Sequence, residues 1–158
     1  MKRIALSLML AIALPALADR MPLPANTPAS YKAECSSCHM AYQPALLSAS
    51  DWRRTMAGLK DHFGTDATVD AQKEQEITTF LERHAGNAGK LGSAGEPPRI
   101  TQTARFIRKH REIAPKYWND PRVKSAANCE SCHRGAAGGN YSEHDIAIRE
   151  LKAPERQW

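Results

Sequence analysis

Two cysteine pairs, each followed directly by a histidine, are the residues of this chain whose types and spacing could do chemistry. On a helical turn, two intervening residues set both thiols toward the two vinyl groups of one haem, and the next residue places an imidazole beneath the iron. The sequence therefore predicts two covalently attached haem c groups, with the cysteines holding the porphyrins and the histidines binding the irons. The two segments are Cys35-Ser36-Ser37-Cys38-His39 and Cys129-Glu130-Ser131-Cys132-His133.

Three other interpretations compete for the same four cysteines. They could pair as disulfides, serve as redox-active dithiols, or form a four-thiolate zinc site. None of these needs a histidine after both pairs. Haem attachment explains the histidines as well as the cysteines, so it is the favoured interpretation.

Each iron also needs a ligand on the side opposite the motif histidine. The identity of this ligand is important because axial ligands are a main determinant of haem potential. Methionine occurs only at positions 1, 9, 21, 40 and 56, so the second haem has no methionine in its own half of the chain. His110 shares an apolar helix face with Phe106 and Ile107, whereas His144 lies in a polar tail. We therefore expect His110 to bind the second iron; the alternative for it is a surface histidine in a basic run.

Four side chains are candidates for the second position on the first iron. Met40 directly follows His39 and cannot reach the opposite face. Both candidate histidines border apolar faces, where a core or edge histidine is the structural alternative, and methionine commonly fills irregular gaps in a core. His62 lies 23 residues after His39. His110 lies 23 residues before His133, and this symmetry favours His62. The four candidates are His62, His84, Met56 and Met21.

Short helices are expected to position these side chains. Apolar residues recur at helical spacing, as in Trp52, Met56, Leu59 and Phe63, and alternating strand patterns are scarce. The expected helices run from Thr27 and Pro28 into the first cysteine pair, from Ser50 to Gly64, from about Asp70 with Ile77, Phe80, Leu81 and His84 on one face, from Thr103 to before Pro115, and from Ser125 through the second cysteine pair.

The chain is expected to be exported to the periplasm and to divide into two halves. Its charged start, its apolar run from Ile4 to Leu14 and a small-residue site ending at Ala18 are typical of a signal peptide. The apolar run is too short to span a bilayer. Glycine and proline concentrate from Gly86 to Pro98, which indicates a linker. The expected organisation is a signal peptide at 1–18, cleaved after Ala18, an N-terminal haem c domain at 19–87, a Gly/Pro-rich linker at 88–98 and a C-terminal haem c domain at 99–158.

The net charge of the chain does not indicate a particular binding partner. The formal charge is +5, but two of these charges leave with the signal peptide, and two haems would add about four propionate charges. The basic residues are scattered without interleaved aromatic residues, which indicates a solvated surface rather than a nucleic-acid site. We therefore expect a soluble protein with no nucleic-acid partner and no membrane span.

Further motifs lie in Cys35 to Tyr42, in Trp52 leading to His62-Phe63-Gly64, in His110-Arg111, and in Asn128 to Gly135. With these motifs the chain resembles the family of small bacterial dihaem cytochromes c over nearly all of its length after the signal peptide. The resemblance implies two bis-histidine, low-spin haems. It also implies a mainly α fold, in which an N-terminal cytochrome c-like helical domain packs with a small, partly irregular C-terminal haem domain. As redox partners it suggests a monohaem cytochrome c that can bind oxygen and a membrane b-type cytochrome.

The expected function is electron transfer through two low-potential haems, not enzyme catalysis. With imidazole on both sides of each iron, substrate has no open position on the metal, and the potential is lower than with methionine as one ligand. The alternative is a haem enzyme or gas-binding protein with one five-coordinate iron, in which His62 or His110 has only a structural role.

Overall fold

Short helices and turns make up the described part of the protein. The computed structural model describes residues 19–143, 146–148 and 150, and within these ranges the strand-like pairings are isolated bridges. The predicted mainly α fold is confirmed, whereas the predicted signal peptide and His144 lie outside the described residues. The α-helices are α1 (Ala29–Cys35), α2 (Ala49–Ala57), α3 (Ala71–Arg83), α4 (Ala88–Leu91) and α5 (Ala104–Lys109), and the 3₁₀ helices are η2 (Pro44–Leu46), η3 (Leu59–Asp61), η4 (Ile100–Gln102), η5 (Pro115–Asn119), η6 (Cys129–Ser131) and η7 (Ala136–Gly138).

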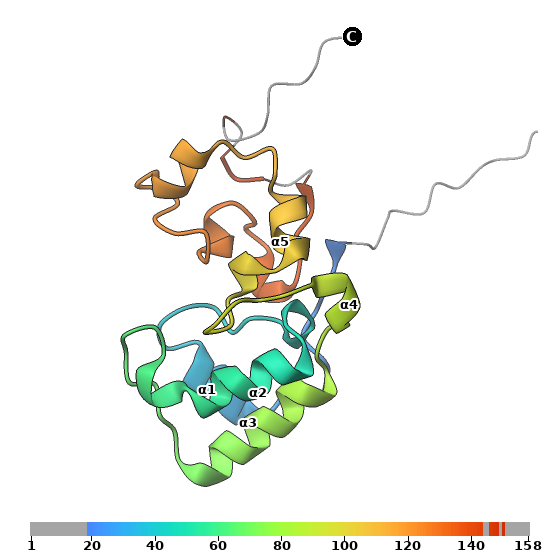
Figure 1. Ribbon diagram of the computed structural model, residues 1–158, viewed down its shortest axis with the longest axis vertical. Coiled ribbons are helices and arrows are strands. Elements are labelled where there is room, and N and C mark those ends of the chain that lie inside the picture. Colours follow the sequence, from blue (N-terminus) through green and yellow to red (C-terminus); the bar gives the residue numbers. More distant parts are fainter. Residues whose placement is uncertain (1–18, 144–145, 149, 151–158) are drawn as a thin grey trace, which may run out of the picture.

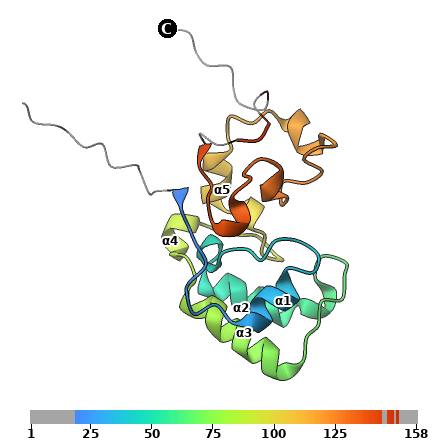
Figure 2. The same ribbon diagram turned by 180° about the vertical axis from the view of Figure 1, so that it is seen from behind.

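Helices α1, α2 and α3 pack together in the N-terminal half, residues 19–87 (Figures 1 and 2). The ring of Tyr31 in α1 lies against Phe80 in α3, with centroids 5.1 Å apart. Trp52 in α2 donates its indole N–H to the carbonyl of Pro44 at 2.7 Å. This core fixes α1 and therefore Cys35, its last residue. The buried core residues are Tyr31, Ala41, Leu47, Trp52, Met56, Ile77, Phe80, Leu81 and Ala94.

Two predicted helices begin where a side chain caps the first turn. Asp70 accepts a hydrogen bond from the N–H of Lys73 at 3.0 Å at the start of α3. Thr103 accepts one from the N–H of Phe106 at 3.1 Å at the start of α5. Such caps satisfy backbone donors that have no partner inside the helix, so the predicted starts of both helices are confirmed.

The helix predicted from Ser50 to Gly64 is shorter in the structure. Helix α2 ends at Ala57 and Gly58 follows it as the C-cap, because glycine has a high conformational cost inside a helix. The 3₁₀ helix η3 comes next, and His62 is its C-cap. His62 therefore lies in a turn and not on a continuous helix face.

The predicted linker, residues 88–98, is packed. It contains α4, and it buries the side chains of Leu91 and Ala94, the latter within the N-terminal core. At Gly92, which leads toward α5, a Cβ would lie 2.7 Å from the Cβ of Ala104. The segment therefore joins the halves through close contacts.

The C-terminal half, described over 99–143, 146–148 and 150, has little regular structure beyond α5. The helix predicted from Ser125 through the second cysteine pair is wrong, because Cys129 begins only the 3₁₀ helix η6. Instead Ser125 accepts a hydrogen bond from a nearby backbone N–H at 3.1 Å, and Asn128 donates to the carbonyl of Val123 at 3.1 Å. Such local bonds compete with helix formation. Among the described residues of this half, only Val123 and Ala136 are buried apolar side chains.

The beginning of the described chain crosses to the C-terminal half, where the blue segment approaches the red one in Figure 2. Met21 donates its N–H to the carbonyl of Gly139 at 2.7 Å, and Tyr141 donates its N–H to the carbonyl of Asp19 at 2.9 Å. The Lys109 ammonium also pairs with Asp19, at 3.1 Å. The two halves are thus packed together, as predicted. Within the described ranges, every helix is too short or too polar to cross a bilayer.

Candidate metal centres

The imidazoles of His39 and His62 face each other in the N-terminal half, with centroids 6.2 Å apart and ring planes inclined by 35°. The Nδ1 atom of His39 lies 2.8 Å from the carbonyl oxygen of Met40. His62 is fixed through its backbone, since its N–H donates to the carbonyl of Thr65 at 2.8 Å and the next residue, Phe63, has a left-handed φ of 55°. The turn that interrupts the predicted helix therefore directs His62 toward His39.

A second pair of imidazoles lies in the C-terminal half. His110 is the C-cap of α5 and His133 follows η6, and their centroids are 6.1 Å apart with the planes at 83°. The Nδ1 atom of His110 lies 2.9 Å from the carbonyl oxygen of Phe106. The Phe106 ring stacks on His110 at 4.0 Å, and Trp118 meets it edge-on at 5.8 Å. These contacts fix the orientation of the His110 ring.

Both pairs have the spacing that two imidazoles need in order to bind one metal from opposite sides. With a metal–nitrogen bond of about 2.0 Å and roughly 1.1 Å from that nitrogen to the ring centre, the centroids lie about 6 Å apart. In His39 and His110 the Nδ1 proton is donated to a backbone carbonyl, which leaves the Nε2 lone pair for a metal. The two donor sets therefore fit haem iron.

Burial lowers the pKa of His62, His110 and His133. A lower pKa favours the neutral imidazole, which is the form that binds a metal. The Nδ1 atom of His133 is buried, and no hydrogen bond of good geometry reaches it from the described residues. A weaker interaction with the backbone of Ser142 partly offsets the effect of burial on its pKa. In the second centre, the Nδ1 proton of His110 is thus donated to the Phe106 carbonyl, whereas the backbone group beside Nδ1 of His133 is that of Ser142.

No two of the four cysteines are joined by a disulfide in the described part of the chain. Burial raises the pKa of Cys35, at the end of α1, and of Cys129, at the start of η6, to about 11 in each case. Redox-active dithiols have lowered thiol pKa values. No three side chains of His, Cys, Asp or Glu in the described ranges converge as a metal cluster. The disulfide, dithiol and zinc interpretations are therefore less favoured than two separate haem attachments.

The large apolar side chains that are exposed in the described chain lie beside the two histidine pairs. Phe63 is 43% exposed and follows His62, and Ile107 is 58% exposed and precedes His110 by about one helical turn. The Arg99 guanidinium lies 4.0 Å from the centre of the Phe63 ring. A porphyrin is a large apolar ring, and covering apolar surface with it is favourable. The exposed apolar surface beside each histidine pair is therefore suited to haem, and so is the spacing of the imidazoles.

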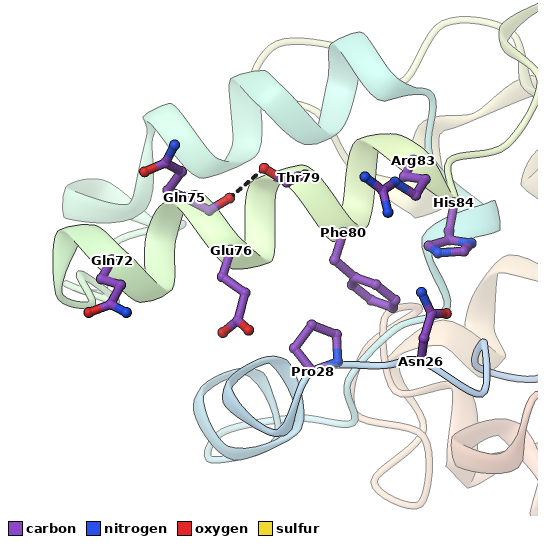
Figure 3. Close-up of a pocket in the computed structure, with 9 residues that line it drawn as sticks. All are labelled: Asn26, Pro28, Gln72, Gln75, Glu76, Thr79, Phe80, Arg83 and His84. Atoms are coloured by element: carbon purple, nitrogen blue, oxygen red, sulfur yellow. Dashed lines mark hydrogen bonds between the residues drawn. The ribbon is translucent and has the colours of Figure 1, made fainter.

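The other candidates for the first iron have different surroundings. Met56 is buried in the N-terminal core and only 6% exposed. His84 follows α3 and lines a cleft of about 390 Å³ between this helix and the segment before α1 (Figure 3). Its ring contacts Phe80, with centroids 5.1 Å apart. Of the two candidate histidines, His62 is therefore the one whose ring lies near that of His39, with centroids 6.2 Å apart.

Three residues to which the sequence analysis assigned no role lie between the two centres. The centroid of the Tyr42 ring lies 4.8 Å from that of the His39 ring, and the centroid of the Tyr141 ring lies 5.6 Å from that of the His133 ring. Burial raises the pKa of Tyr42 to about 12 and raises that of Tyr141 well above its usual range, so both hydroxyls stay protonated. The third residue, Gln43, contacts the C-terminal half. No local sequence signal links residues so far apart in the chain.

Known proteins resemble this chain in sequence and in structure. The family model described as dihaem cytochrome c matches residues 31–141. A diheme cytochrome type c from Shewanella baltica is 38% identical, with a TM-score of 0.69, and the match covers 80% of this chain and 98% of that one. A DHC structure from Rhodobacter sphaeroides is 39% identical, with a TM-score of 0.63 and coverage of 73% and 97%. A diheme cytochrome c from the same organism is 34% identical, with a TM-score of 0.66 and coverage of 76% and 99%. No curated protein matches the chain significantly. The chain therefore belongs to the dihaem cytochrome c family and carries two covalently attached haem c groups.

Proposed function

We propose that the protein is an electron carrier with two bis-histidine haems. Each haem iron supplies one-electron chemistry by changing between its ferric and ferrous states. His39 and His62 bind the first iron, and His133 and His110 bind the second. The observation that carries this assignment is the spacing of the two ring pairs, at 6.2 Å and 6.1 Å. The attachment residues in the proposal are Cys35, Cys38, Cys129 and Cys132.

Two imidazoles on each iron have two consequences. No coordination position is left for a substrate, which favours a carrier over an enzyme. The potential is also low, because methionine raises the potential when it takes the place of a histidine. The hydrogen bonds from His39 and His110 to backbone carbonyls make these ligands more basic. More basic ligands stabilise the ferric state and lower the potential further.

Export, domain organisation and partners complete the proposal. A signal peptide over 1–18 directs the chain to the periplasm, and two haem domains, at 19–87 and 99–158, are joined through 88–98. The resemblance to dihaem cytochromes c supports two redox partners, a monohaem cytochrome c that can bind oxygen and a membrane b-type cytochrome.

Electron paramagnetic resonance of the ferric protein, combined with an optical redox titration, tests the ligand assignment. We expect only low-spin signals and two low potentials. A substantial high-spin signal would mean that one iron is five-coordinate, and the enzyme or gas-binding alternative would then replace the carrier.

Alanine variants assign the ligands one by one. His62→Ala and His110→Ala should each convert one of the two haems to a high-spin form. His84→Ala is the matched control, because His84 lies in the cleft beside α3, and this variant should stay fully low-spin. High-spin iron in the His84→Ala variant alone would transfer the first ligand role to His84.

A further inference from the structure

Gln43 is buried between the two halves, and both the nitrogen and the oxygen of its side-chain amide are hydrogen-bonded. The residue is 1% exposed. Its amide nitrogen donates to the carbonyls of Ala136 at 2.8 Å and Ala137 at 3.3 Å, and its amide oxygen accepts a hydrogen bond from the Tyr141 hydroxyl. A buried amide that uses its donors and its acceptor in this way is held in one orientation.

The position of Gln43 connects it to both centres by short routes. On the N-terminal side, the ring of the preceding tyrosine lies 4.8 Å from that of His39. On the C-terminal side, the ring of its partner Tyr141 lies 5.6 Å from that of His133. Its other partner, Ala136, donates its N–H to the carbonyl of His133 at 2.8 Å. Gln43 therefore holds the turn that follows the second haem-attachment sequence.

An apolar residue of similar size would fill the same space. It would, however, leave the carbonyl of Ala137 and the hydroxyl of Tyr141 without this partner, and the carbonyl of Ala136 with only the N–H of Gly139. Unsatisfied buried polar groups are costly. Other contacts also hold the halves together, including the hydrogen bond of 2.6 Å from Tyr42 to the carbonyl of Ala127 and the backbone bonds of the crossing segment, residues 19–21 with 139–141. Other contacts already hold the two halves together. The hydrogen bonds of Gln43 are directional, so they also define how one half is oriented relative to the other.

We propose that Gln43 is a positioning residue for electron exchange between the two haems. It fixes the second centre relative to the first through Ala136 and Tyr141. This inference rests on the proposed function, because exchange requires two redox-active haems in one carrier. The rate of exchange and the optical coupling of the two porphyrins both depend on their distance and relative orientation, so both report on the contact.

The test compares Gln43→Met, which is similar in size but lacks the amide, with Gln75→Met on the exposed side of α3. Both haem-loaded proteins should keep two haems by mass and low-spin ferric signals. The circular dichroism couplet that the two haems generate in the Soret region should fall about twofold or more in Gln43→Met and stay unchanged in Gln75→Met. Electron exchange between the haems after photoreduction should slow several-fold in the same variant. A purely structural role would lower the unfolding midpoint without changing the couplet of the folded protein.

A milder variant keeps the test decisive if Gln43→Met fails to load haem. Tyr141→Phe removes only the hydroxyl that donates to Gln43, and it should weaken the couplet in the same direction but less. An unchanged couplet in Gln43→Met, or in Tyr141→Phe when that is the variant that folds, would overturn the proposal. A high-spin signal in the unmodified protein is a different result, and it would contradict the proposed function.

Discussion

The rings of His110 and His133 meet nearly at right angles, at 83°, with centroids 6.1 Å apart. In the other pair the two planes are inclined by only 35° at almost the same spacing. The local packing explains the orientation of His110, because its ring stacks on Phe106 and its Nδ1 proton is donated to the carbonyl of the same residue. The two centres thus share a ligand type and a spacing, and they differ in ring orientation.

This difference predicts two distinct low-spin signals from the ferric protein. Nearly parallel imidazoles interact with one iron dπ orbital more than with the other and separate the two in energy, whereas perpendicular imidazoles treat both alike. The haem of the second centre should therefore give the more anisotropic signal, with the larger maximum g value. Low-temperature electron paramagnetic resonance checks this, and a variant with Cys129→Ala and Cys132→Ala should lose the anisotropic signal. Two identical signals would contradict the ring geometry.

His62→Met should raise the potential of the first haem and leave the second nearly unchanged. Methionine is a weaker donor than imidazole, and axial ligands tune haem potentials over about 0.8 V, so we expect a rise on the order of 0.1 V. An optical redox titration measures both potentials. His84→Met is the matched control, since His84 contacts Phe80 beside the cleft, and it should change neither value. Equal shifts in the two variants would remove the basis for choosing His62.

Local signals made part of this structure predictable. The haem-attachment motifs are contiguous, and the caps of α3 and α5 lie three residues from the N–H groups that they bind, so short stretches of sequence were enough. The turn at His62 was missed for the same reason. The apolar spacing of Trp52, Met56, Leu59 and Phe63 continues across Gly58, and the hydrogen bond between His62 and Thr65 that ends it is not visible in that pattern.

Contacts between distant residues and haem-dependent packing were not predictable. Gln43 and Tyr141 are 98 positions apart, and no periodicity relates them. In the C-terminal half, described buried apolar side chains are so few that apolar spacing carries little information, and the helix predicted from Ser125 failed there. In a protein whose cofactors supply part of the core, the hydrophobic pattern of the chain is incomplete by itself.

Asp51 should stabilise the protein in a pH-dependent way. Burial alone would raise its pKa, but hydrogen bonds from Ser48 and Arg54 outweigh this effect and lower it. A carboxylate with a lowered folded-state pKa stabilises the fold above its unfolded-state pKa of about 3.9, and this contribution is lost as the pH falls through the folded-state value. Asp51→Asn should therefore lower the free energy of unfolding by about 1 kcal/mol at neutral pH, and by less as the pH drops below about 4.

Denaturant unfolding of the haem-loaded protein at a series of pH values measures this effect. Glu74→Gln, a change at another acidic residue in the first turn of a helix, is the control, and its cost should be small throughout. A cost for Asp51→Asn that stays the same from neutral pH to pH 3 would show that packing, and not the charge, is responsible.

Gly138 and Gly139 form a natural matched pair at the crossing of the two halves. Gly139 has φ of +77°, and a Cβ there would lie 2.1 Å from the carbonyl oxygen of Met21, whereas a Cβ at Gly138 would meet no heavy atom of the described residues within 4 Å. Gly139→Ala combines a strained backbone with a clash, so it should cost at least about 2 kcal/mol of unfolding free energy. Gly138→Ala should change this free energy little.

Denaturant unfolding followed by Soret absorbance compares the two variants, and amide exchange at Met21 locates the damage. The Met21 N–H is bonded to the Gly139 carbonyl at 2.7 Å, so its protection should fall in Gly139→Ala and persist in Gly138→Ala. Unequal stability with equal protection would place the strain in the turn alone. Equal stability of the two variants would mean that the crossing segment does not pack against this turn in solution, and the contact that closes the two halves at their edge would have to lie elsewhere.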